Sequence, residues 1–267
     1  VPFINFFDGF RTSHEIQKIE TWDYEDLKDM ADMDAIQAFR DHALNPNHPC
    51  QRGSAQNPDI FFQAREACNP FYDALPAVVQ EYMDKVNEKI GTDYKLFNYY
   101  GAEDAEHIII AMGSVNDTIE ETIDYLMAAG KKVGVVKVRL YRPFCKEALI
   151  EAIPDTVKSI AVLDRTKEPG SLGEPLYLDV VAALKGSKFD SVKITSGRYG
   201  LGSKDTTPAQ IIAVFKNLAL PMPKNHFTVG IVDDVTFTSL PQEEEIALGG
   251  EGMFEAKFYG LGADGTV

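Results

Sequence analysis

The distribution of apolar residues along the chain changes near residue 105. Beyond it, four short apolar runs follow one another, at 107–113 (HIIIAMG), 132–141 (KVGVVKVRLY), 159–165 (SIAVLDR) and 191–196 (SVKITS). A segment with apolar residues at helical spacing follows each run, and these segments begin near Ser114, Cys145, Pro175 and Pro208. Alternating strands and helices are typical of an open parallel sheet with helices on both faces. We therefore predict a mainly parallel, Rossmann-like α/β fold for this part of the chain.

The first ninety residues lack that alternation. The run PFINFF at 2–7 predicts a short buried strand that ends in a turn at Asp8. Helical patterns follow, among them DAIQAFRDHAL with Asp34 as its N-cap, and a long helix that begins at Asn69 and ends at Gly91. We expect a partial helical and α/β segment that belongs to another domain.

Charge and cysteine content narrow the class of protein. The 267 residues include 41 acidic and 26 basic ones, a net charge of −15, which disfavours binding to nucleic acid or anionic lipid. No apolar run is long enough for a membrane span, and the N-terminus carries no signal-peptide pattern. Cys50, Cys68 and Cys145 are far apart, which argues against disulfides, a zinc site or an iron–sulfur cluster held by this chain alone. We expect buried, inert thiols in a reducing cytoplasm.

The stretch SGRYGLGSKDTTP (196–208) comes close to a phosphate-binding Walker A loop. In such a loop the Lys and the Ser/Thr lie on the first turn of the helix, where the Lys and the helix N-terminus share the phosphates. Here Lys204 comes after the Ser and upstream of Thr207, where the helix should begin. A glycine-rich turn that presents Arg198, Tyr199 and Lys204 at the carboxyl edge of the sheet fits the pattern better. That edge is where open α/β sheets bind ligands or dock partners.

Two further loops carry candidate chemistry. GLGADG (260–265) matches G-x-G-x-x-G after a predicted strand, but the helix that would complete a phosphate site does not follow within this sequence. The loop 168–175 brings Glu168 near Arg165 at the end of a strand, where the two side chains could line a cleft or be ordinary loop charges. No histidine stands at metal-ligand spacing, and no nucleophile motif is present. The residues therefore assign no catalytic group and no metal site.

Several longer motifs identify a family. VGVVKVRLYRPF, LDRTKEPGSLGEPLYLDV, GRYGLGSKDTTP and NHFTVGIVDDVTFTSLP closely resemble pyruvate:ferredoxin oxidoreductase, also called pyruvate synthase, and FINFFDGFRTSHEIQKIE and FYGLGADGTV extend the likeness to both ends. The resemblance implies a cytoplasmic, homodimeric, multidomain enzyme that uses thiamine diphosphate, Mg²⁺ and 4Fe-4S clusters. Such an enzyme converts pyruvate and coenzyme A to acetyl-CoA and CO2 and reduces ferredoxin or flavodoxin.

The resemblance also implies a division of the chain. Residues 1–92 are similar to the C-terminal part of the pyrimidine-binding domain, 93–240 to a transketolase C-terminal-like second domain, and 241–267 to the start of the domain associated with coenzyme A. The diphosphate motif, the cysteine runs and the activating glutamate of the family have no counterpart in this sequence. We therefore expect the chain alone to bind none of the cofactors, to be inactive, and to have the other domains of the same polypeptide as its partners.

Two groups of residues receive roles from this resemblance. The expected interface or cleft-rim residues, which serve docking rather than bond making, are Arg165, Glu168, Arg198, Tyr199 and Lys204. The residues of a coenzyme A turn, functional only in a full-length chain, are Gly260, Gly262, Asp264, Gly265 and Thr266. Two other classes stay open from the residues: a stand-alone binding or regulatory module with a transketolase-C-like fold, and an independent nucleotide-binding enzyme. Both ends of the sequence read as cut, which favours a fragment of the oxidoreductase.

Overall fold

A six-stranded, mostly parallel sheet forms the centre of the protein. The computed structural model describes residues 3–9, 11–14, 16, 18–19, 21–53, 55–241, 243–249, 252, 254, 256 and 259–260. The strands are β1 (Phe97–Gly101), β2 (His107–Ala111), β3 (Val133–Val138), β4 (Ser159–Asp164), β5 (Lys193–Arg198) and β6 (Phe227–Thr228). Their order across the sheet is β1-β3-β2-β4-β5-β6, and only β1 runs antiparallel to its neighbour. The predicted open α/β fold is therefore confirmed.

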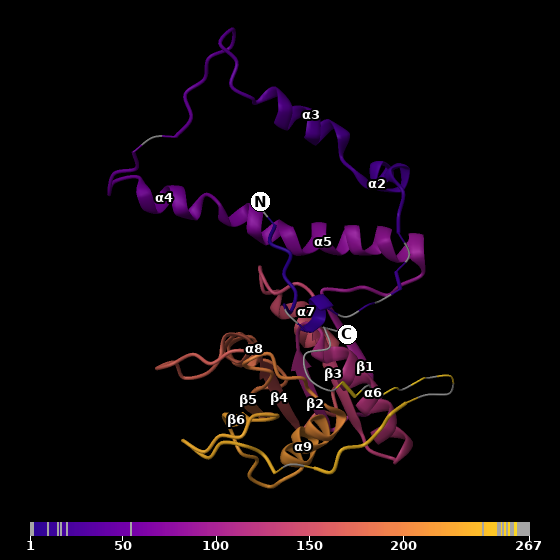
Figure 1. Ribbon diagram of the computed structural model, residues 1–267. Coiled ribbons are helices and arrows are strands. Elements are labelled where there is room, and N and C mark those ends of the chain that lie inside the picture. The colour runs from indigo at the N-terminus through magenta and orange to yellow at the C-terminus, as the bar shows by residue number, and fades with distance from the viewer. Residues whose placement is uncertain are drawn as a thin grey trace.

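Helices cover both faces of this sheet (Figure 1). The described helices are α1 (Arg11–His14), α2 (Tyr24–Met30), α3 (Met33–Asp41), α4 (Phe61–Glu66), α5 (Asn69–Ile90), α6 (Val115–Ala128), α7 (Lys146–Ala152), α8 (Pro175–Leu184) and α9 (Pro208–Leu218). α7 and α8 pack together on one face, whereas α6 and α9 pack together on the other. The four helices predicted from the alternating pattern are thus all present. No helix in the described ranges combines the length and the apolarity needed to cross a membrane.

The central strand β2 shows how the sequence divides the core into two. Ile108 and Ile110 face the cluster under α7 and α8, and Ile109 and Ala111 face the cluster under α6 and α9. Successive side chains of a strand point to opposite faces, so a strand buried on both faces needs apolar residues at every position. This explains the unbroken apolar run that predicted the strand.

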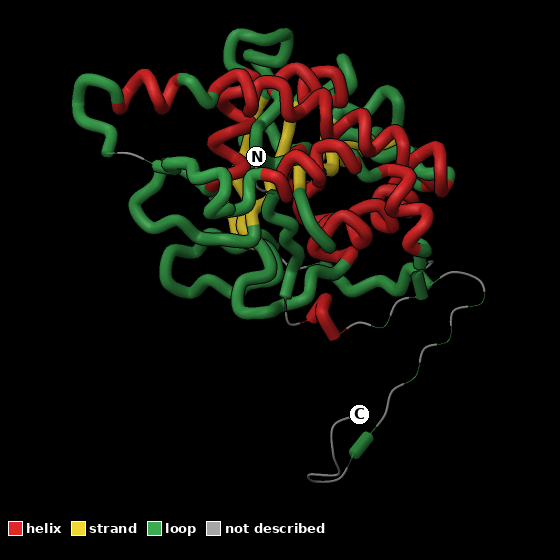
Figure 2. The backbone as a smooth tube through the Cα atoms, turned by 90° about the horizontal axis from the view of Figure 1, so that it is seen from above, coloured by secondary structure: helices red, strands yellow, loops and turns green. Residues whose placement is uncertain are grey.

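Helices α2 to α5 form an arm that extends away from the sheet (Figure 1), and helices lie over the sheet in the view from above (Figure 2). None of these four helices contains a buried residue. The middle of α5 is fastened to the sheet domain, where Val79 and Met83 pack against the core under α7 and α8. Near the end of the same helix, the Asn87 side chain accepts a hydrogen bond from the Tyr94 amide at 2.7 Å and donates one to the Tyr94 carbonyl at 2.9 Å. This joint fixes where the arm leaves the sheet.

Several local predictions for the first ninety residues are wrong. Residues 3–9 have no regular structure, because this segment crosses the end of the sheet and has no strand beside it to pair with. The N-cap of α3 is Asp32 rather than Asp34, since the Asp32 side chain accepts from the Ala35 amide at 2.8 Å.

The predicted burial of the cysteines is also wrong. Cys50 is exposed, and Cys68 and Cys145 are half-buried. The strand and turn predicted at 257–267 fall largely outside the described residues.

The order of the strands defines where a ligand or partner would sit. From β2 the chain passes to β3 on one side and then returns to β4 on the other side of β2. In open α/β sheets such a reversal leaves a crevice beyond the carboxyl ends of the two central strands, which is the usual binding position. Here the crevice is bounded by the residues after Ala111 and after Asp164.

Candidate functional site

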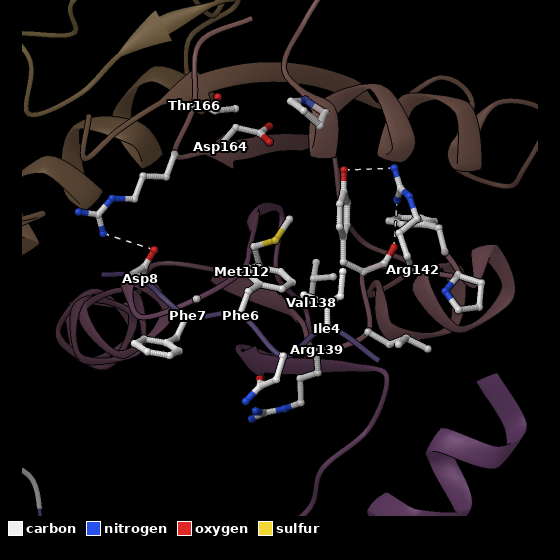
Figure 3. Close-up of a pocket in the computed structure, with 18 of the residues that line it drawn as sticks. Ile4, Phe6, Phe7, Asp8, Met112, Val138, Arg139, Arg142, Asp164 and Thr166 are labelled. Atoms are coloured by element: carbon white, nitrogen blue, oxygen red, sulfur yellow. Dashed lines mark hydrogen bonds and ion pairs between the residues drawn. The ribbon is translucent and has the colours of Figure 1, made fainter. Parts of the chain in front are cut away.

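A hollow of about 1200 Å³ lies at this reversal point of the sheet. Its floor comes from the strand ends, and its walls come from three segments distant in sequence: residues 3–8, the start of α5 and residues 138–144 (Figure 3). Most of the lining is apolar, with Phe6, Met112 and Phe144 as examples. The hollow therefore joins the irregular N-terminal segment and the helical arm to the carboxyl edge of the sheet.

Asp164 is the buried acid on the floor of the hollow. Its two carboxylate oxygens accept hydrogen bonds from the backbone amides of Leu176 at 2.9 Å and Tyr177 at 3.1 Å, in the first turn of α8. These bonds favour the charged carboxylate, but burial outweighs them and raises the pKa of Asp164 to about 6. The carboxylate thus satisfies two amides of the helix terminus that have no partner within the helix.

Arg165, the next residue, faces the N-terminal segment. Its Nη1 atom lies 3.5 Å from a carboxylate oxygen of Asp8, an ion pair drawn as a dashed line in Figure 3, and its Nε donates to the Gly200 carbonyl at 3.2 Å. Asp8 also accepts hydrogen bonds from the Ser114 amide at 2.9 Å and from the Ser114 hydroxyl at 2.5 Å. Two loops at the edge of the sheet therefore meet the N-terminal segment at the Asp8 carboxylate, and a third loop is joined to them through Arg165.

Arg142 forms part of the opposite wall of the hollow (Figure 3). Its guanidinium group lies over the Tyr141 ring, 4.0 Å from the ring centre, and forms an ion pair with Asp179 at 2.7 Å. Burial is the main cause that raises the pKa of the Tyr141 hydroxyl. The phenol is therefore held in its neutral, hydrogen-bonding form on this wall.

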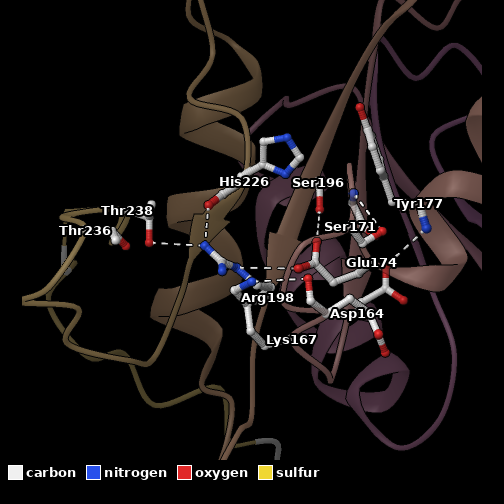
Figure 4. A network of polar contacts seen from close by, with 12 residues as sticks. Asp164, Lys167, Ser171, Glu174, Tyr177, Ser196, Arg198, His226, Thr236 and Thr238 are labelled. Atoms are coloured by element: carbon white, nitrogen blue, oxygen red, sulfur yellow. Dashed lines mark hydrogen bonds and ion pairs between the residues drawn. The ribbon is translucent and has the colours of Figure 1, made fainter.

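Arg198 lies inside the domain and not on its rim (Figure 4). Its Nη2 atom donates to the His226 carbonyl at 2.7 Å, and its Nε lies 4.0 Å from Glu174, which is also buried. Glu174 in turn accepts from the Ser196 hydroxyl at 2.7 Å. Arg198 is buried because it is the last residue of β5 and its side chain points across to β6, where it holds the short edge strand in place.

Tyr199 is buried but lines the hollow. Its hydroxyl donates weakly to the Met112 carbonyl at 3.4 Å, and burial raises its pKa well above the usual range. By contrast, Glu168 and Lys204 are exposed on loops and do not line the hollow. The structure thus brings Arg165 and Tyr199 together and leaves Glu168, Arg198 and Lys204 elsewhere.

The structure describes only the first residue of the expected coenzyme A turn. Gly260 is exposed, while Gly262, Asp264, Gly265 and Thr266 lie outside the described residues. Sequence reasoning missed the two acids that organise the hollow, Asp8 and Asp164. The signal for Asp164 was its place at the end of an apolar strand, whereas Asp8 carried no signal beyond its place in a predicted turn.

Comparison with known families agrees with this division into an N-terminal part and an α/β domain. Residues 1–84 match the family described as the thiamine diphosphate-binding domain of pyruvate flavodoxin/ferredoxin oxidoreductase. Residues 105–211 match the family described as pyruvate:ferredoxin oxidoreductase core domain II. The hollow lies between these two matches, because its lining residues come from both.

Individual relatives are similar over the whole chain. A pyruvate-flavodoxin oxidoreductase of Enterobacter agglomerans is 60% identical over 268 residues, and a pyruvate:ferredoxin oxidoreductase of Moorella thermoacetica is 57% identical over 267 residues. Both alignments cover 100% of this chain and 23% of the relative. A solved 2-oxoglutarate:ferredoxin oxidoreductase from Magnetococcus marinus aligns with 52% of this chain and 22% of its own at 21% identity, with a TM-score of 0.35. The chain belongs to the pyruvate:ferredoxin (flavodoxin) oxidoreductase family and spans about a quarter of the length of these relatives.

Proposed function

We propose that the chain is part of an enzyme that oxidatively decarboxylates pyruvate. In the proposed reaction, pyruvate and coenzyme A give acetyl-CoA and CO2, and two electrons pass to ferredoxin or flavodoxin. The observation that carries this proposal is the 60% identity with a pyruvate-flavodoxin oxidoreductase along the whole chain. We assign residues 1–92 to the thiamine-binding domain, 93–240 to the second domain and 241–267 to the start of a third.

The role proposed for this chain is structural and interdomain. Thiamine chemistry needs a site from which water is excluded, because charged intermediates are stabilised by fixed protein dipoles. The hollow is mostly apolar, and the acids and arginines beside it are already paired. We propose that it closes when the remaining domains pack against it, with Arg165 on its rim and the buried Tyr199 in its wall. The exposed Glu168 and Lys204 would contact those domains, and the buried Arg198 would support the same edge from inside.

We propose that this chain alone holds none of the cofactors of the whole enzyme and that the full-length polypeptide completes their sites. Thiamine diphosphate would supply the carbanion chemistry, with Mg²⁺ at its diphosphate and 4Fe-4S clusters as electron carriers. Among the residues that the structure describes, no three His, Cys, Asp or Glu side chains come together as a metal site. We therefore assign no Mg²⁺ ligand and no cluster ligand to these residues, and we derive no chemical step through the cofactors. The coenzyme A turn at Gly260, Gly262, Asp264, Gly265 and Thr266 remains a proposal for the full-length enzyme.

Large exposed apolar side chains support the proposed partners. They lie on the arm and on the N-terminal segment, and include Phe3, Phe7, Phe39, Phe61, Phe62 and Phe71. Exposed apolar surface on this scale marks a contact with other protein. We propose that other domains of the same polypeptide cover it, in a cytoplasmic homodimer that delivers its electrons to ferredoxin or flavodoxin.

A chimeric enzyme tests the proposal. The 267 residues replace the aligned segment of the Moorella thermoacetica relative, and CoA-dependent reduction of ferredoxin is measured with pyruvate and, as a control, with 2-oxoglutarate. We expect pyruvate turnover within roughly tenfold of the parent enzyme, because most packing contacts are retained at this identity. A soluble, cofactor-loaded chimera that fails to oxidise pyruvate would contradict the proposed function.

A further inference from the structure

The carboxylate of Asp8 occupies the start of helix α6. It accepts from the backbone amide of Ser114 at 2.9 Å and from the Ser114 hydroxyl at 2.5 Å, and Arg165 lies 3.5 Å away. Asp8 comes from the part of the chain that matches the thiamine-binding family, whereas Ser114 and Arg165 come from the part that matches core domain II. We call Asp8, Ser114 and Arg165 the Asp8 cluster.

The start of α6 is arranged to receive a carboxylate from elsewhere. Ser114 is the N-cap of this 14-residue helix, yet its side chain caps no amide of its own helix. Its hydroxyl donates to Asp8 instead, so that Asp8 supplies the acceptor that a helix N-terminus requires. A negative charge at that position is also favoured by the helix dipole and by the neighbouring guanidinium group.

The backbone leaves room for this contact. Gly113 has a φ of +83°, and a Cβ atom there would lie 2.8 Å from a carboxylate oxygen of Asp8. On the other side, Gly200 has a φ of +64°, and a Cβ atom would lie 2.8 Å from Nε of Arg165. Both glycines therefore provide the space that the two charged side chains occupy.

Asp8 is more enclosed than the residues that precede it in the N-terminal segment. The two residues that precede Asp8 are largely in solvent, with Phe6 61% and Phe7 71% exposed. The Asp8 side chain, by contrast, is only 16% exposed and its partner Arg165 24%. A second, longer contact joins the Thr12 hydroxyl to the Ser114 hydroxyl at 3.4 Å. The polar contacts of Asp8 and Thr12 with the sheet domain thus meet at Ser114.

We propose that Asp8 is a positioning residue that fixes the thiamine-binding part of the chain to the carboxyl edge of the sheet through Ser114 and Arg165. The attachment itself follows from the geometry of this chain. Its consequence for turnover rests on the proposed function, because only then does residue 8 belong to a domain whose placement shapes an active site.

The attachment is tested on the 267-residue chain by measuring a distance. Spin labels are placed at Phe7→Cys and Glu168→Cys, both exposed positions, after the native cysteines are replaced by serine. We expect one narrow distance distribution in the parent and in Asp34→Asn, which removes one charge at an exposed site on the arm. Asp8→Asn and Arg165→Met should broaden it at least twofold. A distribution that stays equally narrow in both variants would overturn the proposal.

A second pair of variants tests the displacement of Asp8 without changing any charge. Gly113→Ala places a methyl group against the Asp8 carboxylate, whereas Gly130→Ala, at a similar positive φ of +73°, meets nothing within 4 Å. Both cost backbone strain, so the matched pair separates strain from displacement. We expect the broadened distribution in Gly113→Ala only. The same broadening in both alanine variants would mean that strain, and not Asp8, sets the position, and would contradict the proposal.

The consequence for turnover is tested in the chimera. Because Asp8 is proposed to position a domain and not to touch pyruvate, Asp8→Asn should lower kcat about tenfold and leave the KM for pyruvate within about threefold, as for loss of a well-oriented site. Asp34→Asn should change neither. An active parent chimera with an unaltered Asp8→Asn variant would overturn the positioning role. An inactive parent chimera beside a broadened distance distribution would overturn the proposed function and leave the attachment standing.

Discussion

Arg198 and Glu174 are buried together between β5 and the start of α8, with Nε of the arginine 4.0 Å from Oε1 of the glutamate. The two residues are 8% and 3% exposed, so each charge depends on the other and on a few hydrogen bonds for compensation. We expect Arg198→Met to lower the free energy of unfolding by about 3–5 kcal/mol, because it leaves Glu174 buried without its counter-charge. Urea denaturation at pH 7 measures the loss.

Two controls make this prediction specific. Lys204→Met removes a positive charge from an exposed loop and should change the free energy of unfolding by less than about 0.5 kcal/mol. Adding Glu174→Gln to Arg198→Met should recover part of the loss, because the uncompensated charge is then gone. Equal losses in the single and double variants would show that the charge of Glu174 is unimportant.

Asp164 should make stability depend on pH between about 4 and 7. Burial raises its pKa from 3.8 to about 6, so the folded protein binds this proton more tightly than the unfolded chain does. The resulting contribution is fully present below pH 3.8 and is lost as the pH rises through 6. Relative to Asp164→Asn, which does not titrate, the wild-type free energy of unfolding should fall by up to about 3 kcal/mol across this window. Parallel pH profiles of the two proteins would contradict the prediction.

Gly197 allows β5 to lie against the edge of the sheet. A Cβ atom there would lie 2.3 Å from Cζ of Phe227 and 2.7 Å from Cδ2 of Leu163, both buried. We expect Gly197→Ala to cost about 2–3 kcal/mol of folding free energy through overpacking. Gly186→Ala, where a Cβ atom meets nothing within 4 Å, should cost about 1 kcal/mol for its positive φ alone. The addition of Phe227→Leu should relieve the first variant and leave the second unimproved, and thermal melts report both.

Asn87 should control how firmly the arm is joined to the sheet. Its amide group binds both backbone atoms of Tyr94 and the Thr92 hydroxyl, so Asn87→Ala leaves these groups without their partner. We expect about 1–3 kcal/mol lower stability of this joint, seen as faster hydrogen exchange of the Tyr94 amide. Glu88→Ala, an exposed neighbour on the same helix, should leave that exchange rate unchanged.

The four strands β2 to β5 could be predicted because most of their residues are buried. The clearest case is β2, in which residues 108–111 read IIIA, and each of the four predicted strands is followed by a helix with its own start signal. The edge strands were missed for the opposite reason. β1 reads FNYYG and β6 is only two residues long, so neither has a pattern that exceeds that of a loop. Both gain their pairing only from a neighbouring strand that is already in place.

The candidate site was only partly predictable. Arg165 and Tyr199 follow the ends of strands, which places them at the carboxyl edge from the sequence pattern. Arg198 was expected on the rim. It is instead the last residue of β5, directly before Tyr199, and its side chain points inward to the His226 carbonyl. Asp8 could not be predicted, because its partners Ser114 and Arg165 become neighbours only through the topology of the sheet.

The bond between Asp8 and Ser114 closes a loop of 106 positions along the chain. The contacts among β2, α6 and β3, by contrast, join residues that are close in sequence and have little chain entropy to overcome. The sheet should therefore assemble first from its local units, and the N-terminal segment should be captured afterwards by a surface that is already complete. During synthesis this segment leaves the ribosome well before its binding site exists. Until then the exposed phenylalanines of residues 3–7 can form non-native contacts. The risk of aggregation during synthesis therefore depends on how quickly the sheet folds.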